Sequence, residues 1–267
     1  MSVTEMADSV LSRVEDGVAW ITLNRPDRLN AFAGDMRDRL HDAIDRAASS
    51  AEVRVMVITG AGRGFGTGAD VEVMSDLLGR GDDATFERLV QSGMWVIRRL
   101  RSVEQPVIAA VNGPAAGAGA ALALACDFRV ASARASIGLT FNRIGLHPDW
   151  GATYTLPRLV GPGRAAELVL TGRMVDAEEA ARIGLFERVV PADQFEEAVR
   201  ALAAELAAKP PMALRFAKQS LGASLHADLD AMLNAERERQ MACFRSADAK
   251  EGITAFNEKR TPVFRGE

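Results

Sequence analysis

The sequence is poor in the residues that build disulfide frameworks and metal sites. Its 267 residues include only two cysteines, Cys126 and Cys243, and three histidines. Two cysteines cannot form a disulfide framework, and the spacing of a Cys/His zinc site is absent. Cys126 stands in an apolar stretch, which is more typical of a core residue than of a nucleophile. The sequence therefore predicts no metal site.

An excess of one charge and long apolar runs are also missing. The 32 Lys and Arg residues nearly balance the 36 Asp and Glu residues, which argues against nucleic acid or an anionic membrane as the main partner. No apolar run approaches the roughly 18–20 residues that span a bilayer. The N-terminal stretch MSVTEMADSVLSRVEDG is acidic and polar, unlike a signal or transit peptide. We therefore expect a cytoplasmic protein.

The first half of the chain alternates strand-like and helix-like segments. Short apolar runs rich in β-forming residues, each bounded by Gly, Pro or Asn, predict buried strands. Apolar residues at helical spacing between these runs predict amphipathic helices. This alternation is typical of an α/β layered core with crossover helices. The predicted strands are 18–23, 53–58, 106–111, 127–130 and 135–139, and the predicted helices are 34–49 and 85–101.

The composition changes near Gly161, where Ala, Glu and Arg begin to dominate. Only residues 187–190 predict a further strand, while the remaining segments predict helices. The sequence Lys209-Pro210-Pro211 predicts a break between two of these helices. We therefore expect a core over residues 1–200 and a helical C-terminal region over residues 201–267. The predicted helices are 192–208, 211–221, 227–244 and 249–259.

A glycine-rich segment, GAGRGFGTGAD, follows the second predicted strand at residues 60–70. Such a loop can bring backbone N–H groups close to a ligand. It is not a P-loop, because Ala69-Asp70 stand where that motif has Lys-Ser/Thr. A dinucleotide-binding match is possible only by forcing the glycine spacing. From these residues alone, a ligand-binding loop and a purely structural loop both remain open.

A second small-residue segment, VNGPAAGAGAALALACD, covers residues 111–127. It predicts a strand that enters a Gly/Ala loop and then an apolar helix, with Gly117-Ala118-Gly119 at the start of the helix. The unpaired N–H groups there favour negative charge, such as an oxyanion that forms on a carbonyl. Close packing of a small-residue helix explains the same pattern, so both interpretations remain open.

The third segment of interest, FNRIGLHPDWGATYTL, covers residues 141–156. Asp149 stands beside Trp150 and a glycine, with His147 two residues before it. Asp149 could cap the helix that follows, since Pro-Asp before Gly is common turn chemistry. It could instead be a carboxylate in an apolar pocket, with a pKa tuned for proton transfer.

Taken in order, six stretches resemble the crotonase superfamily, the enoyl-CoA hydratase/isomerase family. The resemblance implies a spiral core of ββα units with a helical C-terminal trimerisation region. It also implies an acyl-CoA thioester substrate, no other cofactor, and a homotrimer or a hexamer of paired trimers. The stretches are LNRPDRLNAF (23–32), VITGAGRGFGTGAD (57–70), QPVIAAVNGPAAGAGAALALACD (105–127), RIGLHPDWGATYTLPRLVG (143–161), LTGRMVDAEEAARIGLFERVV (170–190) and KEGITAFNEKR (250–260).

The resemblance places the two backbone N–H groups of the family's oxyanion hole at Ala69 and Ala118. It also shows a departure from the family pattern. The hydratases of the family carry two glutamates, and the matching positions here are Ala121 and Phe141. Neither side chain can transfer a proton, so ordinary hydratase activity is not expected.

Asp149 falls where the family's hydratases usually have glycine. A Pro-Asp-x-Gly segment there resembles the ring-epoxide and Δ3-Δ2 enoyl-CoA isomerases of phenylacetate degradation, and a single carboxylate suits isomerisation. Three alternatives remain: an atypical hydratase, an aryl-CoA dehalogenase-like hydrolase, and a non-catalytic CoA-ester binder. The dehalogenases are expected to have Trp at the Phe141 position and a histidine on the preceding long helix, which this chain lacks.

The resemblance also implies contacts to the acyl-CoA. Asp27 stands where relatives often have Lys, which departs from the family pattern next to Arg28. Phe256 and Lys259 are expected to reach the adenine and phosphates of CoA in a neighbouring subunit, where a ring can stack and a cation can pair. The implied binding residues are Arg28, Thr67, Gly68, Asp70, Val71, Gly117, Phe141, Trp150, Phe256 and Lys259.

Overall fold

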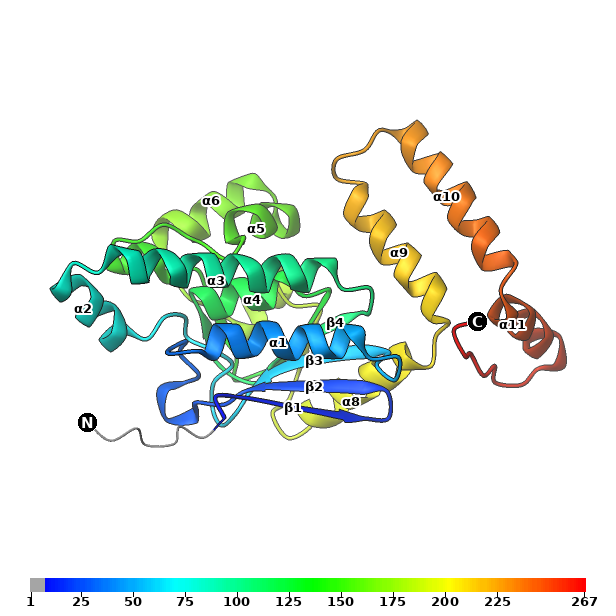
Figure 1. Cartoon of the computed structure of the whole chain (residues 1–267), viewed down its shortest axis with the longest axis horizontal. Helices are drawn as coiled ribbons and strands as arrows, with labels where there is room; N and C mark the ends of the chain where they lie inside the picture. The colour runs from blue at the N-terminus through cyan, green and yellow to red at the C-terminus, as the bar shows by residue number, and fades with distance from the viewer. Residues whose placement is uncertain (1–7) are drawn as a thin grey trace.

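The computed structural model describes residues 8–267, and a six-stranded sheet lies at its centre (Figure 1). The strand order is β1-β2-β3-β4-β6-β9, with β1 antiparallel to β2 and every later pair parallel. A parallel sheet is covered on both faces, and β2, β3 and β4 are accordingly almost entirely buried. The strands are β1 (Val10–Glu15), β2 (Val18–Leu23), β3 (Val55–Gly60), β4 (Val107–Val111), β6 (Phe128–Ser132) and β9 (Arg188–Val190).

Alternate strand residues pack into two separate cores on the two faces of this sheet. Ile21 and Met56 belong to the core shared with α1, α3 and α4. Trp20 and Val57 belong to the other core, which Leu202 of α8 helps to close. Side chains on a strand point to opposite faces in turn, so adjacent apolar residues serve both cores. These helices are α1 (Met36–Ser49), α3 (Asp83–Ser102), α4 (Ala118–Ala125) and α8 (Phe195–Ala207).

A ladder of short strands runs beside the large sheet and gives the chain its repeating ββα character. β5 (Ala115–Ala116) pairs with β7 (Ser136–Gly138), and β7 pairs with β8 (Val175–Asp176). Two single bridges extend the ladder, from Gly66 to Ala115 and from Phe32 to Ala69. The ladder therefore places the turn after β3 directly beside the turn that precedes α4.

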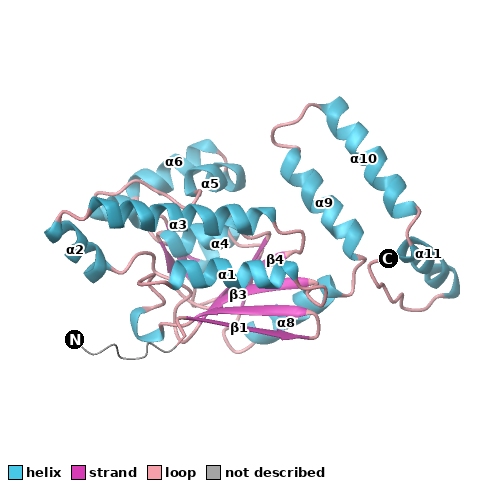
Figure 2. Ribbon diagram, viewed as in Figure 1, coloured by secondary structure: helices cyan, strands magenta, loops and turns pink. Residues whose placement is uncertain are grey.

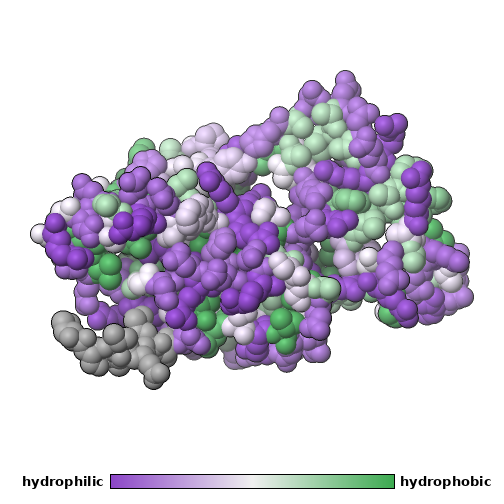
Figure 3. All heavy atoms as spheres, in the orientation of Figure 1, coloured by the Kyte–Doolittle hydropathy of each residue, from purple (hydrophilic) through white to green (hydrophobic). Residues whose placement is uncertain are grey.

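Three C-terminal helices, α9 (Pro211–Ala223), α10 (Leu229–Phe244) and α11 (Ala247–Glu258), lie apart from the sheet (Figures 1 and 2). An ion pair of 2.6 Å between Lys218 and Asp127 ties α9 to the core. No residue within α9 or α10, both fully described, is buried. Leu221 and Leu229 are each 72% exposed, and Figure 3 shows apolar residues at the surface in this region.

Most predicted elements are confirmed within a few residues, and residues 18–23 coincide with β2. The expectation of a single strand after Gly161 is wrong, because β8 adds a two-residue strand too short for any periodic pattern. β1 was missed since five of its six residues are exposed. The predicted division after residue 200 falls inside α8. Further elements are α2 (Val71–Arg80), α5 (Ala152–Val160), α6 (Pro162–Thr171), α7 (Ala177–Arg182) and 3-10 turns at Pro26–Arg28 and Thr140–Ile144.

The acidic N-terminal stretch begins with residues 1–7, which lie outside the described residues. Within residues 8–267, no helix combines the length and apolar character that a membrane crossing requires.

Candidate active site

A cavity of about 660 Å³ opens between the two glycine-rich turns, the 3-10 turn at Thr140–Ile144 and the start of α3. Apolar side chains form most of its wall, including Met74, Phe86 and Leu146. Within residues 8–267, ionisable side chains reach it from two places, Arg37 from α1 and the segment 143–149. Nine of the predicted site residues line it: Thr67, Gly68, Ala69, Val71, Gly117, Ala118, Phe141, Asp149 and Trp150.

Two peptide N–H groups are available at the cavity wall. In the parallel bridge between Phe32 and Ala69, Phe32 donates to Gly68 O and accepts from Asp70 N, so the Ala69 amide is left out of the ladder. Ala118 is the first residue of α4, where an amide has no partner within the helix. Among the described residues, neither amide donates a backbone hydrogen bond outside the helices.

Glycines allow these two turns to approach each other closely. Gly68 has a φ of 87°, and a Cβ there would stand 3.3 Å from the Ala118 nitrogen. Gly119 packs against the backbone of Gly66, where a Cβ would lie 2.0 Å from the carbonyl oxygen. The glycine-rich sequence is therefore required by backbone packing, and the same packing leaves the Ala69 and Ala118 amides near each other.

Asp149 is a carboxylate in a low-dielectric setting. Burial raises its pKa to about 6, although the charges of Arg37 and His147 and its own backbone amide oppose that rise. Its Oδ1 atom is buried without a hydrogen-bond partner. Asp149 does not cap α5, because that helix has Gly151 at its N-cap and no side-chain cap. The capping alternative is therefore excluded, and Asp149 lines the cavity instead.

Trp150 fixes the backbone that carries Asp149. Its φ is 51°, a left-handed value that is rare for a bulky residue, and its side chain is only 2% exposed. The indole lies over Gly93 of α3, so closely that a Cβ there would stand 2.3 Å from Nε1. On its other side the ring packs against Phe32, with centroids 4.7 Å apart. These contacts hold the 149–150 turn against the core.

The two positions that carry glutamate in the family's hydratases hold no acid in this cavity. Ala121 is fully buried within α4, and Phe141 lines the cavity as an aromatic wall. Among the described lining residues, Asp149 is the only Asp or Glu. Cys126 lies in the core, and burial raises the pKa of its thiol to about 12, which leaves it protonated and unreactive at neutral pH.

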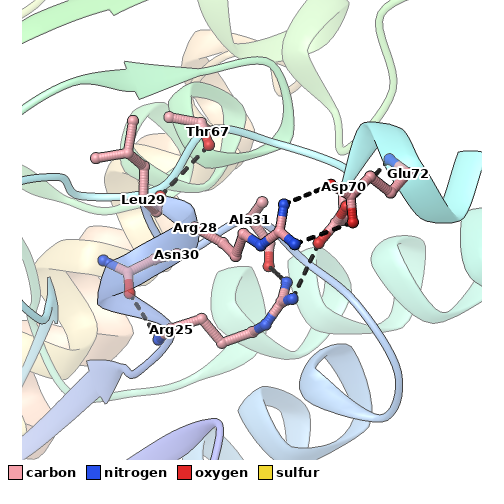
Figure 4. A network of polar contacts seen from close by, with 8 residues as sticks. All are labelled: Arg25, Arg28, Leu29, Asn30, Ala31, Thr67, Asp70 and Glu72. Atoms are coloured by element: carbon pink, nitrogen blue, oxygen red, sulfur yellow. Dashed lines mark hydrogen bonds and ion pairs between the residues drawn. The ribbon is translucent and has the colours of Figure 1, made fainter.

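Arg28 and Asp70 do not line the cavity, and both are engaged in ion pairs beside it (Figure 4). Arg28 binds Glu72 through two contacts of 2.7 and 3.0 Å and remains exposed. Asp70 caps α2 by accepting from the Glu72 amide and pairs with Arg25 at 2.9 Å. The Asp70 side chain therefore stabilises the turn that presents the Ala69 amide.

Phe256 and Lys259 lie at the end of α11, away from the cavity of the same chain (Figure 1). Phe256 is 84% exposed, and Lys259 has a left-handed φ of 56° as the C-cap of its helix. Their expected contact with CoA in a neighbouring subunit stays a prediction.

Arg37 is one of the cavity residues that sequence reasoning missed. It stands next to Met36 and three residues before Leu40, on the apolar face of α1, and it is only 5% exposed. A charged residue at a core-facing helical position is the signal that could have found it.

Comparison with known proteins identifies the family. A family model described as enoyl-CoA hydratase/isomerase matches residues 13–267. The 1,2-epoxyphenylacetyl-CoA isomerase of Escherichia coli is 39% identical over 98% of this chain and all of that protein. The short-chain-enoyl-CoA hydratase of Clostridium acetobutylicum is 36% identical over 95% of this chain and 96% of that protein.

Solved structures show the same fold. The enoyl-CoA hydratase from Bacillus anthracis superposes with a TM-score of 0.93 at 35% identity, covering 97% of this chain and all of that one. A structure from Streptomyces coelicolor, described as a putative enoyl-CoA hydratase, has a TM-score of 0.92 at 38% identity, covering all of this chain and 98% of that one. The predicted α/β spiral fold is thereby confirmed.

Proposed function

Because the chain belongs to the enoyl-CoA hydratase/isomerase family, we propose that it is an acyl-CoA isomerase in which Asp149 carries the proton. The observation that supports this choice is that Asp149 is the only Asp or Glu among the described residues of the cavity wall. Isomerisation needs one group that removes a proton at one carbon and returns it at another. The similarity to the Escherichia coli isomerase points the same way.

In the proposed reaction, the amides of Ala69 and Ala118 donate hydrogen bonds to the thioester oxygen. This makes the neighbouring C–H bonds more acidic, and the Asp149 carboxylate removes one of these protons. The negative charge moves to the oxygen, where two fixed donors stabilise it; one such donor typically contributes about 3–4 kcal/mol. Asp149, now protonated, returns the proton at a different carbon. The double bond has moved and no water is consumed. The thioester bond to CoA stays intact, so the product leaves as an acyl-CoA.

A carboxyl group with a pKa of about 6 suits this double role. It is ionised at neutral pH and can therefore act as a base, yet it is a stronger base than an exposed aspartate. We further propose that Arg28, the main chain of residues 67–71 and Gly117 hold the CoA portion, while Phe141 and Trp150 contact the acyl group. Phe256 and Lys259 complete the CoA site of a neighbouring copy in a homotrimer or in paired trimers, for which the exposed apolar residues of α9–α11 provide surface.

The test is the nearly isosteric substitution Asp149→Asn. Incubation of an acyl-CoA in deuterated water, followed by mass spectrometry, measures proton exchange at the α and γ carbons. We expect the exchange rate to fall about 10²–10⁴-fold, as for loss of a general base. The dissociation constant for the thioester should stay within about threefold, since the amides and the CoA contacts are unchanged.

Asp76→Asn is the matched control, because Asp76 lies on the outer side of α2, where it pairs with Arg80. This control should exchange protons at the wild-type rate. Wild-type exchange by Asp149→Asn would overturn the proposal. Efficient hydration of crotonyl-CoA by the wild type would favour the atypical hydratase. Release of halide from a halogenated aryl-CoA would favour the dehalogenase-like hydrolase. Tight binding of acyl-CoA without any exchange would identify a binder.

A further inference from the structure

The distal cavity, a smaller space of about 250 Å³, lies beside the candidate active site, between α2, the start of α3 and the turn at residues 144–146. It shares five wall residues with the candidate active site, so the two spaces adjoin. All five are apolar and bring no charge between the two spaces. They are Val71, Met74, Phe86, Ile144 and Leu146.

The two cavities differ in what they can do chemically. Ala69, Ala118 and Asp149 belong to the wall of the candidate active site and not to that of the distal cavity. The acids of the distal cavity stand at the connection between α2 and α3, where Asp82 is engaged as the N-cap of α3. The distal cavity is therefore suited to holding a hydrocarbon group, while the chemistry belongs to the candidate active site. Its own wall residues are Ser75, Leu77, Leu78, Gly81, Asp82 and Asp83.

Exposed apolar side chains form the rim of the distal cavity. Leu78 is 79% exposed, Val71 63% and Ile144 54%, whereas Leu77, the neighbour of Leu78 on α2, is buried. Exposed apolar residues gathered at one place are typical of a ligand-binding groove. A hydrocarbon chain that lay against them would remove this surface from water, which favours binding. A short acyl group would end within the candidate active site and leave the rim uncovered.

We infer that the substrate is an acyl-CoA with a medium-length or longer hydrocarbon chain, and that this chain runs from the thioester past Met74 and Phe86 into the distal cavity. The inference rests on the proposed function, because the chain reaches this space only if the thioester lies at the amides of Ala69 and Ala118. It adds a substrate class and makes the wall of the distal cavity the determinant of chain length.

Equilibrium binding of a chain-length series tests the inference without any need for turnover. The probes are butanoyl-, hexanoyl-, octanoyl- and decanoyl-CoA, whose saturated chains have no double bond to move. Titration calorimetry would compare the wild type with Ser75→Trp, which places a large ring at the exposed edge of the distal cavity. Asp76→Trp is the matched control, because it adds the same ring at the next residue of α2, which is exposed and lines neither cavity.

We expect the wild-type affinity to rise about tenfold for each pair of methylene groups that enters the distal cavity, since burying one methylene favours binding about three- to fourfold. Ser75→Trp should weaken the binding of decanoyl-CoA at least about tenfold and change that of butanoyl-CoA by less than about twofold. Asp76→Trp should bind all four probes as the wild type does. Thermal unfolding would verify that each variant is folded.

Leu78→Glu provides a second test at a position where the side chain is already exposed. A carboxylate at the rim should weaken the binding of decanoyl-CoA about tenfold, because the hydrocarbon chain would have to desolvate it. Leu170→Glu is the control: Leu170 is 76% exposed on α6 and lines neither cavity. Light scattering on both variants would measure the size of the assembly, and we expect no change in either.

Three results would overturn the inference and leave the proposed function intact. One is equal binding of all four probes by the wild type, and another is wild-type binding of decanoyl-CoA by Ser75→Trp. The third is a smaller assembly in Leu78→Glu with an unchanged preference for long chains, which would assign the rim to a second copy of the chain. Failure of all four thioesters to bind would overturn the proposed function and this inference together. Loss of proton exchange in Asp149→Asn is measured separately, so the two proposals fail through different observations.

Discussion

The two halves of the cavity are built on different principles. The half around Gly68, Ala69 and Ala118 consists of peptide groups that two turns bring together, and its side chains are absent or small. The half around Arg37 and Asp149 consists of charged side chains, and three of their polar atoms, Arg37 Nε and Nη1 and Asp149 Oδ1, are buried and unpaired. The first half relies on close packing of backbone, and the second half relies on the low dielectric of its surroundings.

This difference predicts how substitutions in each half change activity and stability. In the peptide half, around Gly68, Ala69 and Ala118, only proline would remove a functional N–H group. Other substitutions act through an added Cβ that moves the backbone. In the charged half, the functional groups can be replaced directly, and their removal should relieve the cost of burying them. Substitutions in the peptide half should therefore reduce activity and stability together, whereas those in the charged half should separate the two.

Gly68→Ala should give the largest effect on the peptide half. A Cβ at Gly68 would meet Ala116 O at 3.2 Å and Ala118 N at 3.3 Å, on a residue with φ of 87°. We expect the rate of proton exchange to fall about 100-fold, as for the loss of one oxyanion donor, together with a stability loss of about 1–2 kcal/mol. Exchange measurements and chemical denaturation provide both values.

Gly79→Ala is the control for this prediction, because Gly79 lies in α2 with open space around its Cβ position. That substitution should leave activity unchanged and should stabilise the helix slightly. An active Gly68→Ala enzyme would show that the approach of the two turns is not required.

Gly93→Ala should damage the charged half through packing. The added Cβ would lie 2.3 Å from Nε1 of the rigid Trp150 side chain, so the indole must move and carry the Asp149 backbone with it. A displacement of about 1 Å at a catalytic group can cost up to about 100-fold, and we expect an activity loss of about 10- to 100-fold. Steady-state kinetics of the isomerase reaction measures this loss.

The combination of Gly93→Ala with Trp150→Phe should recover part of the activity, since the smaller ring leaves room for the methyl group. Gly163→Ala in α6, where the Cβ position is open, is the control. An unchanged kcat in Gly93→Ala would mean that the position of Trp150 does not govern Asp149.

The two halves also differ in how far the sequence predicted them. The peptide half was predicted because clustered Gly and Ala residues follow apolar strands, a pattern readable over a dozen residues. Asp149 was found as one residue with two interpretations, and only the three-dimensional structure excluded the capping one. Arg37 was missed because the cavity that it lines forms from segments more than 100 residues apart in the chain. Local patterns predicted the strands and helices, while the pairing of distant charged groups depends on tertiary packing.

The pH dependence of activity should reflect the ionisation of Asp149 in the charged half. The peptide half has no group that titrates in this range. Asp149 must be ionised to act as a base, so kcat/KM should rise with pH and level off above the pKa of about 6. At pH 5 the expected value is about tenfold below the plateau. In Arg37→Met the midpoint should move to higher pH, because the positive charge of Arg37 lowers the pKa of Asp149. A profile that is flat between pH 5 and pH 8 would contradict the assignment of Asp149 as the base.

The smallest expected effect is a gain in stability when Asp149 is replaced. Burial raises the pKa of Asp149 from 3.8 to about 6, so the folded state holds this proton up to a higher pH than the unfolded state does. The unfolded state therefore binds fewer protons between about pH 4 and pH 6, and the free energy of unfolding falls as pH rises through this range. Above pH 6 the full penalty is present, and below pH 4 it is absent. Because the carboxyl group still reaches the open cavity, we expect a penalty of about 1 kcal/mol at pH 7 rather than the roughly 3 kcal/mol that the complete change in pKa would give.

Asp149→Asn should accordingly raise the melting temperature by about 2–4 °C at pH 7 and leave it unchanged at pH 4, at one fixed protein concentration. Differential scanning calorimetry at the two pH values measures this difference. Asp76→Asn, which removes an exposed carboxylate, should show no such dependence on pH. A lower melting temperature for Asp149→Asn at pH 7 would mean that the carboxylate stabilises the fold. In that case the two halves of the cavity would fail in the same way, and the separation of activity from stability in the charged half would be wrong.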